Sequence, residues 1–180
     1  MSLKKEFDEL KNPNELMNFM DEKIKYGWIG KDGELRENSV EGFLNNYRVS
    51  SLEEILENGY GTCFEQVELE REFFSRQKIT SSSYMIIASH MVHSFLVFEM
   101  EGKFYRFEHS SWKNKGIYEF DSIDNLLQNT VELFMNNHKI KSAKRITLIS
   151  YSKLRENIDL KDMKEELLSN RKNLVEKLFK

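Results

Sequence analysis

The sequence has few of the residues that cross-link, break or anchor a chain. It contains one cysteine, one proline and eight glycines in 180 residues. A single cysteine cannot form an intramolecular disulfide, which favours the reducing cytoplasm over an oxidising compartment. No apolar run approaches the roughly 20 residues that cross a bilayer. Residues 2–6 (SLKKE) are not followed by the apolar core and small-residue cleavage site of a signal peptide. We therefore expect a cytoplasmic protein with no membrane partner.

Neither the charge nor the composition points to disorder or to nucleic acid. The net charge is −3, and 39% of the residues are hydrophobic, with 13 Phe, 7 Tyr and 2 Trp. Residues 139–180 carry more basic than acidic residues, but interspersed acids are typical of a solvated helix face rather than a phosphate-binding region. We expect no nucleic-acid partner. The length predicts one domain over residues 1–180, with its core in about 14–151 and a C-terminal helix in 152–180.

Capping signals predict three helices in the first half of the chain. Residues 12–15 (NPNE) form a helix start, and apolar residues then recur at four-residue spacing. Residues 51–54 (SLEE) open a short helix that ends at residues 58–59 (NG). After a glycine loop, a third helix is expected from about Cys63 to Gln77.

The second half of the chain changes to short aromatic and β-branched segments. Strands are expected over residues 84–87, 93–100, 103–109 and 146–151, and helices over about 122–136 and 160–179. Glu101 and Gly102 make the second and third strands a hairpin. Helices followed by antiparallel strands and further helix predict an α+β fold.

Cys63 is the strongest candidate for chemistry. A lone cysteine is commonly a small buried hydrophobic residue. Here, however, it is expected at a helix N-terminus, where the helix dipole and free N–H groups favour a thiolate and could stabilise an oxyanion. Gly59 and Gly61 would let the backbone approach a substrate closely.

The hairpin selects a base from the four histidines. With a two-residue loop, His93 lies opposite Ser110, and Glu108 is its diagonal neighbour on the same face, while His109 points to the other face. His93 and Glu108 can therefore act as a base and its orienting partner. Alternatively, His93 is a core histidine and Glu108 an exposed carboxylate paired with Arg106.

Three segments resemble the transglutaminase-like superfamily. The run from Gly59 to Leu69 (GYGTCFEQVEL) is similar to its nucleophile motif, in which a glycine-bounded loop delivers a cysteine to the start of a helix. Residues 93–98 and 104–110 resemble its histidine strand and its acidic strand. With residues 26–28 and 47–56, which look like the lead-in of small bacterial members, the resemblance covers roughly residues 14–125.

The resemblance implies a papain-like core, with a nucleophile helix packed on an antiparallel sheet, and thiol acyl chemistry. Cys63 would be the nucleophile, His93 the general base and then acid, and Glu108 the orienting group, where the family usually has aspartate. Tyr47 and Gln66 are candidates for the second oxyanion donor.

The resulting leading hypothesis is a cysteine peptidase, amidase or transglutaminase-type acyltransferase, whose substrate is a peptide, a protein or a small acyl compound. Its rivals are a catalytically silent binding module of the same fold and a nucleic-acid-associated factor that uses the basic C-terminal region.

Cofactor and metal motifs are weak. His90 and His93 could imitate a zinc site with Cys63, but three-residue spacing on a strand turns the two imidazoles to opposite faces. Gly59 and Gly61 lack the third glycine and the preceding strand of a dinucleotide site, and no acidic loop of EF-hand type is present. We therefore expect neither a cofactor nor a metal.

Overall fold

Two β-sheets and their surrounding helices form an α+β fold, as predicted. The structure is a computed structural model that describes residues 2–89, 91–169 and 172–179. The α-helices are α1 (Leu3–Glu9), α2 (Pro13–Lys23), α3 (Phe43–Asn46), α4 (Leu52–Asn58), α5 (Cys63–Arg76), α6 (Ile123–Asn137), α7 (Leu160–Leu168) and α8 (Val175–Leu178), and η1 (Ala143–Arg145) is a 3-10 turn. The strands are β1 (Lys25–Ile29), β2 (Leu35–Glu37), β3 (Tyr60–Gly61), β4 (Ser81–Ala88), β5 (Met91–Met100), β6 (Lys103–Glu108), β7 (Gly116–Phe120) and β8 (Thr147–Tyr151).

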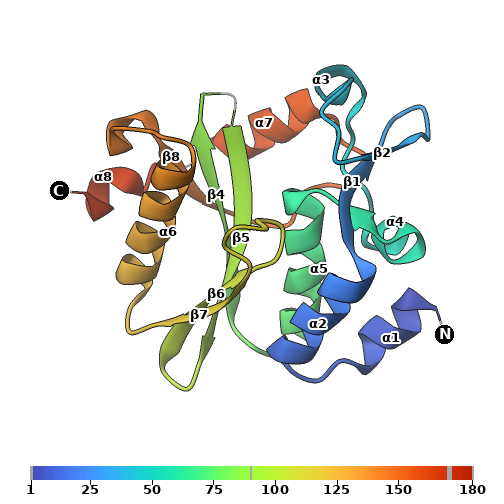
Figure 1. Cartoon of the computed structure of the whole chain (residues 1–180), viewed down its shortest axis with the longest axis horizontal. Helices are drawn as coiled ribbons and strands as arrows, with labels where there is room; N and C mark the ends of the chain where they lie inside the picture. Colours follow the sequence, from blue (N-terminus) through green and yellow to red (C-terminus); the bar gives the residue numbers. More distant parts are fainter. Residues whose placement is uncertain (1, 90, 170–171, 180) are drawn as a thin grey trace.

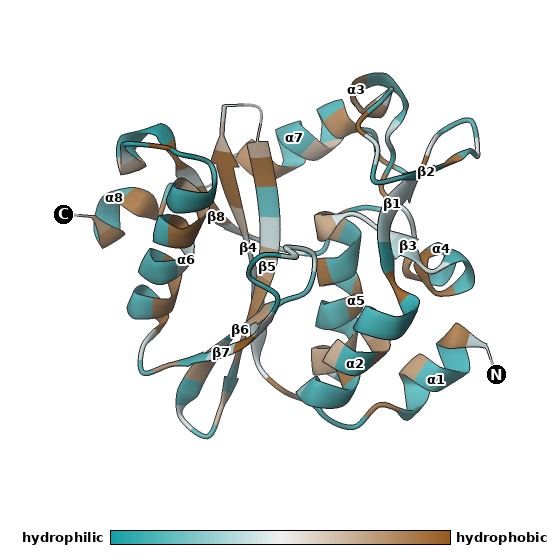
Figure 2. Ribbon diagram, viewed as in Figure 1, coloured by the Kyte–Doolittle hydropathy of each residue, from teal (hydrophilic) through white to brown (hydrophobic). Residues whose placement is uncertain are grey.

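The larger sheet is antiparallel, has the order β7-β6-β5-β4-β8 and lies between two helical layers (Figure 1). Helix α5 packs on one face, and α6 packs on the other. Alternating side chains of β5 enter two separate cores: Leu96 and Phe98 pack with α5, whereas Phe95 and Val97 pack with α6. The outward faces of α1, α2 and α6 are largely hydrophilic (Figure 2). The two cores thus fix which side chains of the sheet face which helix.

The hairpin register is the one predicted. Met100 pairs with Lys103, and Leu96 pairs with Phe107, so the loop contains only Glu101 and Gly102. Both loop residues have positive φ, 54° and 74°, as the tight turn of a two-residue hairpin requires. Because side chains alternate between the two faces along each strand, this register places Glu108 on the face that Phe95 and Val97 share, as predicted.

The prediction of one continuous C-terminal helix over residues 160–179 is wrong, because the segment forms two helices. Helix α7 ends at Leu168, and α8 begins only at Val175. Between them, Asn173 accepts a hydrogen bond from the backbone N–H of Leu148 in β8 (3.0 Å), and the Leu174 N–H donates to the Leu148 carbonyl (2.8 Å). The break follows from burial, because α7 packs into the α5-side core and α8 into the α6-side core.

A small sheet of order β2-β1-β3 was not predicted. Its outer pair, β1 and β2, is antiparallel, whereas β1 and β3 run parallel and pair Tyr26 with Gly61. This pairing brings β1 beside Gly61, which lies two residues before α5 begins at Cys63. Helix α1 and strand β7 were also missed. Among the residues described, no helix is both long enough and apolar enough to traverse a bilayer.

Candidate active site

Cys63 is the first residue of α5, as its sequence context predicted. Its side chain is a free thiol, and the residue is only 4% exposed. The turn before it is held by Glu65, whose carboxylate accepts hydrogen bonds from the Thr62 N–H and hydroxyl, both at 2.7 Å. At Gly61 an added Cβ would lie 3.2 Å from the Glu65 Cβ, so glycine allows this tight entry to the helix. The loop therefore fixes the thiol at the positive end of the helix dipole.

His93 and Glu108 meet as the register predicted. The His93 Nε2 atom lies 2.6 Å from Glu108 Oε2. The other carboxylate oxygen of Glu108 accepts hydrogen bonds from the Ser111 N–H at 3.0 Å and the Ser110 hydroxyl at 3.4 Å. Glu108 is 3% exposed, so the alternative of an exposed strand carboxylate is wrong. Its partners orient it towards the imidazole and hold it there.

The Cys63 thiol lies beside the His93 ring, close enough to raise the pKa of His93. Because Nε2 faces Glu108, Nδ1 is the ring nitrogen that remains for the sulfur. Burial lowers the pKa of His93, but the charge of Glu108, the neighbouring Cys63 and the hydrogen bond with Glu108 outweigh burial and raise this pKa to about 10. The imidazole is therefore protonated at neutral pH, the form that stabilises an adjacent thiolate.

Tyr26 is a site residue that the sequence analysis did not identify. Its hydroxyl lies beside both the side chain and the backbone of Cys63. Negative charge at Cys63 and at Glu65 raises the pKa of Tyr26 far above its ordinary value, although 42% of this residue is exposed. The phenol consequently remains a neutral hydrogen-bond donor at neutral pH. Only the long-range pairing of β1 with β3 places it here, and the sequence carries no local signal for that pairing.

The two predicted oxyanion candidates direct their polar groups elsewhere. The Tyr47 hydroxyl lies 3.3 Å from the Thr62 hydroxyl, in a buried position beside Glu65. The Gln66 amide donates to the Gly61 carbonyl at 2.9 Å, and its oxygen lies 2.7 Å from His109 Nδ1. Both side chains thus support the loop before Cys63.

His109 lies on the opposite face from Glu108, as predicted, and contacts α5. Burial, reinforced by Lys115, lowers the pKa of His109 to about 4 against the opposing charge of Asp21. Its Nδ1 therefore donates to Gln66 in the neutral ring. Its Nε2 lies 3.2 Å from Asp21 Oδ1, which also accepts from Lys115 at 2.5 Å, and this ring nitrogen has no hydrogen-bond partner among the described residues.

Glu70 is a buried acid behind the site. It is 2% exposed, lies two helical turns after Cys63, and has one carboxyl oxygen with no hydrogen-bond partner among the described residues. Burial, with the charge of Glu108 second, raises the pKa of Glu70 well above its ordinary value. A protonated Glu70 adds no negative charge beside His93 and Glu108.

Cys63, His93 and Glu108 open onto one cleft of about 830 Å³. Its walls also include Tyr26, Trp28, Val40, Phe43, Leu44, Met91, Val92, Arg106, Trp112, Thr130, Phe134, His138, Met163, Lys164 and Leu168, among others. These residues come from the small sheet, the β2–α3 segment, the larger sheet, α6 and α7. The site is therefore a junction of segments that are far apart in the sequence.

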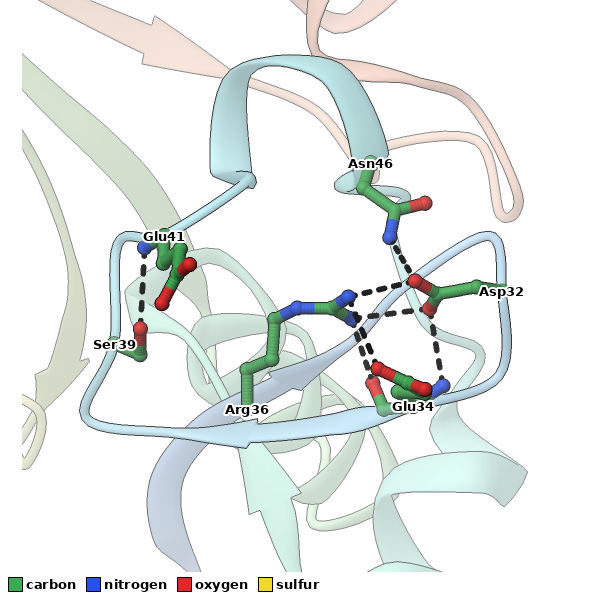
Figure 3. Close-up of polar contacts among 6 residues, drawn as sticks. All are labelled: Asp32, Glu34, Arg36, Ser39, Glu41 and Asn46. Carbon is green, nitrogen blue, oxygen red and sulfur yellow. Dashed lines mark hydrogen bonds and ion pairs between the residues drawn. The ribbon is translucent and has the colours of Figure 1, made fainter.

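One wall of this cleft is a loop that a polar network secures (Figure 3). The Arg36 guanidinium donates to both oxygens of Asp32, at 2.6 and 3.0 Å, and the Asn46 amide donates to the same carboxylate. The Arg36 side chain stacks 4.8 Å from the Trp28 ring, whose Nε1 donates to the Ser39 carbonyl at 2.8 Å. The network fixes both ends of the segment that presents Val40 and Leu44 to the cleft.

Within the described ranges, no group of His, Cys, Asp and Glu residues has the geometry of a metal site. His90, from the zinc pattern considered above, lies outside those ranges. No protein-family model matches the chain, and no curated protein matches it significantly. Function must therefore be argued from the site itself.

Proposed function

We propose that this protein is a thiol enzyme with a papain-like, transglutaminase-like core, which transfers an acyl group from an amide or ester to water or to an amine. The observation that carries the proposal is that Cys63 lies beside the hydrogen-bonded pair of His93 and Glu108 at the wall of a large cleft. A nucleophile, a base and an orienting acid in contact are the general requirement of covalent acyl catalysis.

The chemistry follows from the protonation states. The Cys63 thiolate attacks the carbonyl carbon of the substrate, and the carbonyl electron pair moves to oxygen. Protonated His93 then gives its Nδ1 proton to the leaving amine or alkoxide as the carbon–heteroatom bond breaks, which leaves a thioester on Cys63. Water or an amine attacks the thioester carbon, and His93 accepts its proton. The carbon–sulfur bond then breaks, which releases the acyl product and restores the Cys63 thiolate beside protonated His93. Glu108 keeps the imidazole oriented throughout.

Tyr26 supplies a candidate second oxyanion donor. Its hydroxyl lies beside the Cys63 backbone, at the N-terminus of α5. A substrate oxygen between the Cys63 N–H and the Tyr26 O–H would accept from both groups. Loss of one such donor typically costs about a hundredfold in rate. We expect Tyr26→Phe to slow acyl-enzyme formation from p-nitrophenyl acetate by about this factor while the thiol still reacts with iodoacetamide.

The main test needs no natural substrate, because Cys63 is the sole cysteine. Alkylation by iodoacetamide, followed by intact mass, should stay fast near pH 6, well below the pH of about 8.5 at which ordinary thiols ionise. His93→Ala should move the pH profile back towards that of an ordinary thiol. His138→Ala removes another histidine of the cleft and should leave the profile in place.

The rival hypothesis is a catalytically silent binding module of the same fold. It predicts little alkylation of folded protein at any moderate pH, with reaction only on unfolding. That result would refute the hypothesis that the protein is a thiol enzyme. An activated thiol that releases no burst of p-nitrophenol from p-nitrophenyl acetate would refute only acyl transfer.

A further inference from the structure

The cleft differs in charge from the rest of the chain. The whole sequence carries a net charge of −3, yet Glu108 is the single carboxylate among the described residues that line the cleft. The same walls hold Arg106 and Lys164, together with two histidines. Glu108 is committed to His93, so the cleft presents unbalanced positive charge to a ligand.

Arg106 is the buried part of this positive charge. It lies on β6, two residues before Glu108, and is only 2% exposed. Its Nη1 donates to the Thr130 hydroxyl at 3.0 Å and towards the Asn129 carbonyl oxygen at 3.4 Å, both on α6. Its guanidinium also stacks on the Tyr118 ring at 4.6 Å. All three neighbours are neutral.

What Arg106 lacks is an anion. Its Nε has no hydrogen-bond partner, and it forms no ion pair, within the part of the chain that the structure describes. The nearest acid, Glu108, accepts from His93 with one oxygen and from Ser111 with the other. A buried guanidinium without a counter-ion is costly, and a carboxylate is the group that its fork of donors fits best.

The mouth of the same cleft is apolar. Six of the nine large apolar side chains that are exposed in the described residues lie there, including Trp112 at 81%, Val40 at 88% and Leu44 at 75%. Exposed apolar groups gathered around one cavity typically mark a binding site. A ligand that suits both parts has an apolar body and an anionic group.

We propose that the cleft selects a small amphiphilic carboxylate as its acyl donor, with the apolar body at the mouth and the carboxylate on Arg106. The inference rests on the proposed function, since it assumes that the ligand occupies the Cys63 cleft. It adds a specificity-determining residue, Arg106, and a substrate class to that function.

The first experiment measures how fast Cys63 reacts with a series of maleimidoalkanoic acids of increasing chain length, each against its neutral N-alkylmaleimide. In the wild type, the acid should react faster than its neutral partner at the chain length that lets the carboxylate reach Arg106. Arg106→Gln should lower this ratio about tenfold, the usual size of a charge-assisted hydrogen bond. Arg145→Gln removes an exposed arginine outside the cleft and serves as the matched control.

A second experiment separates this inference from the proposed function. Cys63→Ala removes the thiol, and isothermal titration compares octanoate and N-acetyl-Leu-Leu with their amides. If either acid binds more tightly than its amide and Arg106→Gln abolishes the difference, the carboxylate site is supported. The acid that binds more tightly shows whether the ligand is an alkyl carboxylate or a peptide. Arg106→Lys keeps the charge if Arg106→Gln does not fold.

The outcomes are distinct. Equal rates for acids and neutral maleimides at every length, with equal affinity for acids and amides, would overturn the carboxylate site while leaving thiol catalysis intact. An inert thiol together with acid-selective binding would overturn the proposed function instead.

Discussion

His93 and His109 occupy nearly matching places on the two faces of the larger sheet, and their ionisation is opposite. Burial lowers the pKa of both rings. His93 nevertheless has a pKa of about 10, because the Glu108 carboxylate lies 2.6 Å from its Nε2 and the neighbouring Cys63 raises the pKa further. His109 has a pKa of about 4, because burial and the Lys115 cation outweigh the charge of Asp21, and its hydrogen-bond partner Gln66 is neutral. Burial acts on both rings, so the charges of the neighbouring groups decide which histidine stays protonated at neutral pH.

The largest expected effect is at Glu108→Gln, which gives His93 a neutral partner like that of His109. Burial then acts with less opposition, and we expect the pKa of His93 to fall from about 10 by several pH units, measured from histidine ring proton shifts in NMR titrations. Glu119→Gln removes an exposed carboxylate of β7 and should leave this pKa unchanged. A His93 pKa still near 10 in Glu108→Gln would show that Cys63 alone sustains the imidazolium.

The opposite faces of the two histidines were predictable because they depend on strand parity. Once the loop was fixed as Glu101 and Gly102, the side chains of His93 and Glu108 had to share a face and His109 had to take the other. The start of α5 at Cys63 was equally local, since the glycine loop and the helix-forming run lie next to each other in the sequence.

The remaining parts of the site depend on contacts between distant segments. Tyr26 reaches Cys63 only because β1 runs parallel to β3, and no periodicity in either short strand indicates this pairing. The C-terminal helix was predicted as continuous because residues 160–179 are amphipathic, whereas Asn173 binds the backbone of β8 and interrupts it. Long-range polar contacts of this kind leave no local pattern to find.

The converse exchange is Gln66→Glu, which gives His109 a carboxylate at the position of its present 2.7 Å contact. We expect the pKa of His109 to rise from about 4 to above its ordinary value of about 6.5, detected in the same NMR titration. The shift should be smaller than at His93, because Lys115 still opposes protonation and the Gln66 bond to Gly61 is lost. Gln77→Glu, at the exposed end of α5, is the matched control. A pKa that stays near 4 would mean that burial and Lys115 dominate over any partner.

The smallest effect expected is on stability, and the two histidines should act in different pH windows. For His93, the folded pKa lies above the unfolded value, so its stabilisation is complete below about pH 6.5 and is lost as the pH rises towards 10. For His109, the folded pKa lies below the unfolded value, so its contribution is present above about pH 6.5 and is lost as the pH falls towards 4.

His109→Gln isolates the acid window, because glutamine keeps a donor for Gln66 but does not titrate. Between pH 7 and 4, the wild type should lose up to about 3 kcal/mol more unfolding free energy than this variant, measured by urea unfolding. Carboxylates that titrate in the same range contribute equally to both proteins and cancel in the difference. His138→Gln, at a less buried histidine whose pKa is also lowered, should reduce the acid loss by much less. If the unfolding free energies of the wild type and His109→Gln fall in parallel with pH, His109 is protonated as readily in the folded chain as in the unfolded one. The pKa of His109 would then not be lowered by folding, and the contrast with His93 would be refuted.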